Sequence, residues 1–157
     1  MPRGVRHIVG CDEIAGTAPA FPPTRPDERL VLGRVSLPSR DFPYPPDYEP
    51  AIPGPFRYFA KYPLFVRAGS QPVELIVPSA WRTRLAITWG NHGPYQAAIV
   101  QVNGCPPSAS GPWLGYPGGY YLRRPACVPL IVRVGAKRTR VRIGIGKQCP
   151  TPPRPAS

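Results

Sequence analysis

Four arginines near the end of the chain have the spacing of an anion-binding surface. Arg138, Arg140 and Arg142 lie two residues apart in the segment VPLIVRVGAKRTRVRIGIG, so in a β-strand all three point to one face. Arg133 lies in the apolar run that precedes them. Guanidinium groups pair well with phosphate and carboxylate oxygens. We therefore expect these four arginines to form an anion-binding stripe; the alternative is an ordinary solvated sheet face.

The strands that must position this stripe are visible in the same segment. Both runs alternate with a period of two, which is typical of half-buried strands, and a Gly-Ala-Lys-Arg turn joins them. With the turn over residues 135–138, Arg133 lies opposite Arg140, an arrangement that destabilises a sheet unless an anion relieves it. The same register predicts one buried face made of Leu130, Val132, Val134, Val141 and Ile143.

Charge is divided unevenly along the chain. Residues 1–74 hold nine basic and all eight acidic residues, whereas residues 75–157 hold eleven basic residues and no acidic one. The arginines of the second half, Arg123 and Arg124 included, therefore lack local carboxylates after Glu74. An anionic polymer, a membrane surface or an acidic protein is the expected partner. No helix-turn-helix, zinc-finger or RNA-binding motif supports sequence-specific nucleic-acid recognition.

A second candidate site is the aromatic segment WLGYPGGYYLRRP. Flat aromatic faces can stack on sugar rings, so a carbohydrate-binding platform is the alternative function. Its residues would be Trp113, Tyr116, Tyr120 and Tyr121. The competing interpretation is structural, with a Gly118-Gly119 turn and aromatic side chains that plug the end of the domain. Trp81 and Trp89 are predicted to belong to strands and to the core.

Catalytic and metal chemistry find little support. His92 lies in Gly90-Asn91-His92-Gly93, which predicts a solvated turn, and seven of the eight carboxylates lie in segments of low predicted order. No nucleophile elbow and no phosphate-binding glycine loop is present in the sequence. Two histidines and four cysteines without a C-x-x-C pair make a zinc site improbable. We expect no enzymatic activity, no cofactor and no metal.

The four cysteines indicate two disulfides and therefore an oxidising compartment. Three pairings are open, and we expect Cys105–Cys127 and Cys11–Cys149. Residues 1–10 lack a typical signal peptide, so we expect a signal segment missing from this sequence. Ile8-Val9-Gly10-Cys11 resembles the end of a lipoprotein signal, although acylation of Cys11 would leave an odd thiol. No apolar run approaches the ~20 residues of a membrane span.

Short strands with frequent turn signals predict the fold class. Twenty-six prolines disfavour long helices. Apolar runs at residues 30–37, 64–67, 73–77, 85–89 and 97–102, with the terminal hairpin, predict about seven strands. We expect an all-β, antiparallel, immunoglobulin-like β-sandwich over residues 30–149, with a proline-rich connection at 38–56. Residues 1–29 are predicted to be an irregular arm, and residues 150–157 a disordered tail.

Two longer stretches of the sequence resemble those of a known protein family. VRAGSQPVELIVPSAWRTRLAITWGN and GGYYLRRPACVPLIVRVG, followed by VRIGIGKQC, are similar to a family of uncharacterised exported proteins of high-GC Gram-positive bacteria. The resemblance covers roughly residues 58–149 and implies export and a disulfide-bonded β-domain. It implies no activity for any residue. The sequence thus favours an exported, non-enzymatic envelope protein that binds an anionic ligand, with a purely structural domain as a third possibility.

Overall fold

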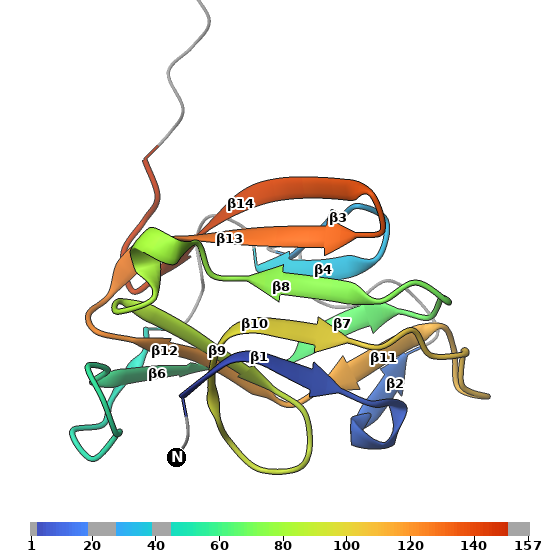
Figure 1. The fold of residues 1–157 in the computed structure, drawn as a ribbon, viewed down its shortest axis with the longest axis horizontal. Coiled ribbons are helices and arrows are strands. Elements are labelled where there is room, and N and C mark those ends of the chain that lie inside the picture. Colours follow the sequence, from blue (N-terminus) through green and yellow to red (C-terminus); the bar gives the residue numbers. More distant parts are fainter. Residues whose placement is uncertain (1–2, 19–27, 39–44, 151–157) are drawn as a thin grey trace, which may run out of the picture.

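The computed structural model describes residues 3–18, 28–38 and 45–150 (Figure 1). Within these ranges the chain forms fourteen β-strands and two 3-10 helical turns, so the all-β prediction is confirmed. No helix in this part of the chain is long and apolar enough to cross a membrane. The predicted tail and parts of the arm and the proline-rich connection fall in 151–157, 19–27 and 39–44, outside the described residues.

The strands divide between two sheets. The larger sheet contains nine strands: β1 (Arg3–Val9), β5 (Asp47–Tyr48), β6 (Tyr58–Lys61), β8 (Val73–Ile76), β9 (Leu85–Trp89), β10 (Gln96–Val102), β12 (Gly118–Leu122), β13 (Ala126–Val134) and β14 (Lys137–Ile145). The smaller sheet contains five: β2 (Gly16–Ala18), β3 (Glu28–Val31), β4 (Val35–Pro38), β7 (Leu64–Arg67) and β11 (Trp113–Tyr116). The helical turns are η1 (Cys11–Glu13) and η2 (Ser79–Trp81).

The larger sheet runs in the order β14-β13-β8-β10-β9-β12-β6-β5, with β1 beside β10, and the smaller one in the order β2-β11-β7-β4-β3. β1 pairs with β10 in parallel, and the remaining pairs are antiparallel. Figure 1 shows the smaller sheet behind the larger one, with the β3–β4 hairpin behind the β13–β14 hairpin. Arg29 Nη2 of β3 donates to the backbone oxygen of Arg142 on β14 over 2.6 Å, which joins the two edge strands.

One core fills the space between the sheets. Leu75, Ile87 and Leu130 of the larger sheet and Leu64 and Leu114 of the smaller one are at most 1% exposed and belong to the same cluster. Burying such side chains contributes about 1.5–3 kcal/mol each. This common core positions the β13–β14 hairpin, because Leu130, Val132, Val134 and Ile143 are buried in it and Val141 packs against it. The predicted apolar face of the hairpin is therefore confirmed.

The seven-strand, immunoglobulin-like prediction is wrong, because the described residues form fourteen strands that curl into a half-barrel. The predicted strand over residues 30–37 is in fact the β3–β4 hairpin. Leu32 and Gly33 take φ values of 51° and 69°, as a type I′ turn requires. The predicted arm contains β1, η1 and β2, so its irregularity does not hold for residues 3–18.

The predicted register of the terminal hairpin is also wrong, by two residues. Val134 pairs with Lys137, so the turn consists of Gly135 and Ala136 alone. Gly135 takes φ 59°, which suits the first central position of a two-residue type II′ turn. Because side chains alternate with a period of two, this shift keeps every residue on its predicted face but changes its cross-strand partner. Arg133 lies opposite Arg138 instead of Arg140.

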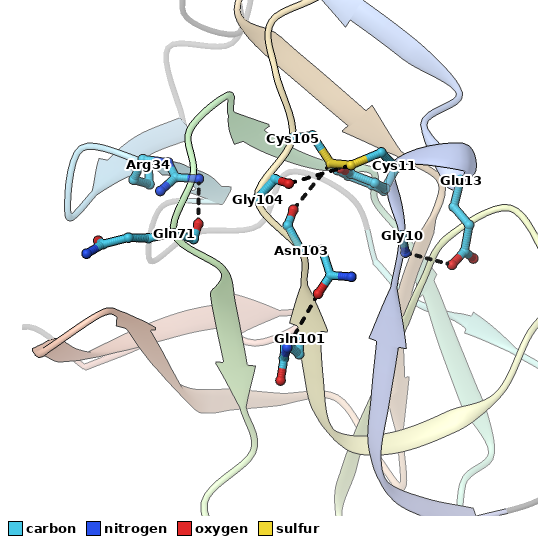
Figure 2. The surroundings of a disulfide bond; sticks show 10 residues. Gly10, Cys11, Glu13, Arg34, Gln71, Gln101, Asn103, Gly104 and Cys105 are labelled. Atoms are coloured by element: carbon cyan, nitrogen blue, oxygen red, sulfur yellow. Dashed lines mark hydrogen bonds between the residues drawn. A yellow bond between two sulfur atoms is a disulfide. The ribbon is translucent and has the colours of Figure 1, made fainter.

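Two disulfides form as predicted, but with different partners. The structure pairs Cys11 with Cys105 and Cys127 with Cys149, so the predicted Cys105–Cys127 and Cys11–Cys149 pairing is wrong. Figure 2 shows the Cys11–Cys105 bond. The parallel strands β1 and β10 end side by side at Val9 and Val102, which brings these two cysteines together. With its sulfur in this bond, Cys11 has no thiol to acylate, and the lipoprotein hypothesis fails.

Candidate anion-binding site

A basic cleft of about 650 Å³ lies beside the first half of β13. Six of its lining side chains are cationic: Arg84, Arg123, Arg124, Arg140, Arg142 and Lys147. The others are Trp81, Pro125, Ala126, Cys127, Pro129, Gln148 and Pro150. None of the lining residues is acidic. We call this region the basic cleft.

β14 supplies two of the arginines. Arg140 and Arg142 are exposed and alternate with Val141 and Ile143, which face the core. Arg140 lies opposite Ile131 and Arg142 opposite Pro129 in the β13–β14 ladder. Cys127 and Pro129 of β13 therefore form a floor, with the two arginines along one side; we call Arg140 and Arg142 the strand side.

The opposite side is built from two turns, and we call Arg84, Arg123 and Arg124 the turn side. The β9–β12 ladder ends at the pair Leu85–Leu122. One residue beyond it, the Arg123 amide donates to the Arg84 carbonyl over 3.2 Å. This bond joins the turn after η2 to the connection between β12 and β13. Arg84 and Arg123, 39 positions apart in sequence, thus become neighbours at the cleft.

Trp81 orients one of these arginines. The Arg84 guanidinium lies 3.7 Å from the centroid of the Trp81 ring, a cation–π arrangement, and its Nη2 donates to the Ala80 carbonyl over 3.4 Å. Trp81 is half-buried and packs against the core. The ring therefore supports Arg84 in the cleft. The prediction that Trp89 belongs to the core is confirmed at 1% exposure, whereas Trp81 belongs to both the core and the cleft.

A disulfide holds the third part of the cleft. Cys127 lies on β13 opposite Gly144, and its bond to Cys149 ties the segment after β14 back to β13, with 5.0 Å between the two Cα atoms. This segment carries Lys147 and Gln148 into the lining. The Cys127–Cys149 bond thus holds the segment with Lys147 and Gln148 at the cleft. The predicted pairing did not include this role.

The cleft charges lack internal compensation. Among the described residues, none of the six cations forms an ion pair with a carboxylate. Like charges that gather at one surface raise the local positive potential and attract anions from solution. The arrangement can therefore bind a negatively charged group. No cluster of three metal-binding side chains occurs in the described ranges.

Arg133 and Arg138 do not belong to the cleft, although the sequence placed them in one stripe with Arg140 and Arg142. They face each other at the turn end of the hairpin. On the other edge of β13, Arg133 lies opposite Glu74 of β8. Glu74 also forms an ion pair with Arg6 at 3.2 Å. A carboxylate from the first half of the chain thus lies within the basic face at this end.

The aromatic platform does not exist as a surface. Trp113, Tyr116, Tyr120 and Tyr121 are between 1% and 5% exposed, because they lie in β11 and β12 and not in a loop. Burial raises the pKa of Tyr116 to about 12, with a smaller contribution from the charge of Glu13. The predicted turn at Gly118 is strand backbone, where a Cβ would clash with the Thr88 carbonyl oxygen. Neighbouring elements cover the rings, so these four side chains offer no exposed platform for a sugar.

His92 lies in the exposed connection between β9 and β10 and has a structural partner. Its Nε2 lies 3.1 Å from Asp12 Oδ2, and its Nδ1 lies 3.7 Å from Glu13 Oε1. Glu13 is 3% exposed and also accepts hydrogen bonds from the amides of Gly10 and Asn91. These contacts tie η1 to the β9–β10 connection and present no nucleophile.

The charge pattern of the sequence pointed to Arg123 and Arg124 but not to Arg84, Lys147 or the role of Trp81. The usable signal was the absence of acidic residues after Glu74, which left every basic residue of the second half as a candidate.

Comparisons with protein-family models, with curated proteins and with solved structures found no match to this chain. The assignment of function therefore depends on the cleft itself.

Proposed function

We propose that this chain is an exported, non-enzymatic binding protein that holds an anionic ligand of the cell envelope in the basic cleft. The observation that carries this proposal is the gathering of six cationic side chains without one acidic residue in the lining. Three separate parts of the fold supply them: the strand side, the turn side and the disulfide-held segment. Cations brought together from distant positions repel one another, so a bound anion would stabilise the arrangement.

The composition of the lining supports binding over catalysis. It contains no histidine, no carboxylate and no hydroxyl side chain, and its one cysteine is disulfide-bonded. General acid–base and nucleophilic mechanisms need such groups near the reacting atoms. Two disulfides in a chain of this size support an oxidising compartment and therefore export.

Retention on phosphocellulose in a salt gradient tests the proposal. Arg140→Gln/Arg142→Gln removes the strand side and should elute at clearly lower salt than the wild type. Arg133→Gln/Arg138→Gln is the matched control, because it removes two arginines of the same hairpin that lie outside the cleft. Both variants lower the formal net charge from +12 by two, to +10.

The control should elute close to the wild type. Equal shifts for the two variants would mean that retention follows net charge alone, and the basic cleft would then be an ordinary solvated surface. Thermal unfolding of each variant checks that the fold is intact, which we expect because all four side chains are exposed.

A further inference from the structure

We propose that the ligand of the basic cleft is a linear polyanion of the phosphate class, which bridges the strand side and the turn side, and not a single anionic headgroup. This inference rests on the proposed function and specifies its ligand. It follows from three observations on the cleft: the amount of charge, its distribution over two sides, and the ordering of Arg84.

The amount of charge exceeds what one anion can neutralise. The cleft holds six cations, and the described residues provide them with no carboxylate partner. A phosphate monoester carries about −1.5 to −2 at neutral pH. One headgroup would leave most of the positive charge uncompensated, whereas a chain with several phosphates could balance all of it.

The distribution of charge suits an extended ligand. Arg140 and Arg142 are separated by two residues along β14, which corresponds to about 7 Å, and the turn side lies across the floor formed by Cys127 and Pro129. A cleft of about 650 Å³ is within the range that holds whole small-molecule ligands. A chain with closely repeated phosphates can contact successive arginines on both sides, whereas a single phosphate has only four oxygens to share among six cations.

The orientation of Arg84 indicates which chemical groups the cleft binds. Arg84 lies over the Trp81 ring, while Trp81 also packs against the core. The ring thus serves to orient a guanidinium and is not a free platform for a sugar or a base. An oriented guanidinium favours paired hydrogen bonds to phosphate oxygens. Recognition therefore depends on anionic groups rather than on ring stacking.

The test compares inorganic phosphate, triphosphate and a polyphosphate of about fifteen units, with binding followed by tryptophan fluorescence over a range of salt concentrations. Trp81 lines the cleft, while Trp89 and Trp113 are 1% and 4% exposed, so the signal reports on the cleft. Loss of the signal in Trp81→Phe, with binding retained by calorimetry, confirms its origin. The slope of log affinity against log salt concentration reports how many charged contacts form between protein and ligand. It does not depend on the number of positions at which a long chain can bind.

For the long chain we expect a slope on the order of −4, as six contacts to a single-stranded polyanion give. Arg140→Gln/Arg142→Gln and Arg123→Gln/Arg124→Gln should each reduce the slope to about −3. With inorganic phosphate, which has no condensed counterion atmosphere, the slope should be much shallower than with the long chain, and only one of the two pairs should matter.

Two results would overturn the inference while leaving the proposed function intact. One is a long-chain slope that equals that of triphosphate or ignores one of the two arginine pairs. The other is binding to phosphatidylglycerol vesicles as tight per phosphate as binding to the chain, which would identify a lipid surface. Failure of the proposed function looks different: no probe binds, or Arg133→Gln/Arg138→Gln weakens binding as much as the cleft variants do.

Discussion

The two ends of the β13–β14 hairpin carry the same residue type and have different surroundings. At the turn end, Arg133 and Arg138 face each other, and Glu74 of the adjacent strand lies beside Arg133. At the other end, Arg140 and Arg142 border the basic cleft, whose lining adds four further cations and no acid. One hairpin thus has an end with a carboxylate on the adjacent strand, itself paired with Arg6, and an end whose surroundings contain no carboxylate.

This difference shows that the availability of an arginine depends on the strands beside it. β8 pairs with β13 only over residues 131–134, so Glu74 reaches the turn end and no further. Beyond that point, the segment after β8 turns into η2 and brings Trp81 and Arg84 instead. The same sheet edge therefore changes from mixed charge to positive charge within a few residues.

The largest expected effect is on stability, and it differs between the two disulfides. Replacing Cys11 and Cys105 with Ser opens a loop with a sequence separation of 94 and should lower the free energy of unfolding by about 5 kcal/mol; for Cys127 and Cys149, separated by 22, the loss should be about 3 kcal/mol. Only the second pair should also weaken polyphosphate binding, because it frees the segment that carries Lys147. Urea unfolding and fluorescence titration measure the two effects. Equal binding by the two folded variants would contradict this positional role.

A smaller effect is expected at Trp81. Trp81→Leu keeps an apolar side chain against the core but removes the surface beneath Arg84, and a lost cation–π contact of about 0.5–1 kcal/mol corresponds to roughly two- to fivefold weaker binding. Trp81→Phe should retain part of the affinity because it keeps a ring. Calorimetric titration with polyphosphate measures both variants. If leucine binds as well as tryptophan, the ring does not orient Arg84.

The smallest effect should be a gain at the turn end. Glu74→Gln removes the carboxylate beside Arg133 and Arg6, which should add one or two phosphate contacts and make the salt slope more negative by about 1. Glu49→Gln is the matched control, since it changes the net charge equally at an exposed position. A change of slope that is the same for both variants would show that Glu74 does not compensate the turn end.

Sequence patterns predicted the local features of this molecule better than the long-range ones. β7 and β9 have the bounds expected from their apolar runs, and the terminal hairpin has its expected faces. Alternation is a local property, so it can be read from a few residues. The parallel pairing of β1 with β10 joins segments about ninety residues apart, and nothing in either segment specifies the other. The Cys11–Cys105 bond follows from this pairing and was therefore missed. The Cys127–Cys149 bond lies beside the local β13–β14 ladder, but the predicted pairing had already assigned both cysteines to other partners.

The candidate site shows the same division. Arg140 and Arg142 were predicted because their spacing of two is visible in the sequence. Arg84 was missed because its place beside Arg123 depends on the β9–β12 ladder, and Arg133 was misassigned because its neighbour Glu74 comes from β8. Whether an arginine has a carboxylate beside it is a question of tertiary structure. The charge pattern alone could indicate only that the second half of the chain has few internal partners.

Residue-resolved arginine modification can show whether an anionic ligand binds in the basic cleft and not at the turn end of the hairpin. Phenylglyoxal labels accessible guanidinium groups, and peptide mass spectrometry can compare labelling with and without polyphosphate. We expect polyphosphate to protect the five arginines of the cleft, Arg84, Arg123, Arg124, Arg140 and Arg142, while Arg133 and Arg138 are labelled as before. Equal protection of the two ends of the hairpin, or no protection in the cleft under conditions where polyphosphate binds, would contradict this expectation.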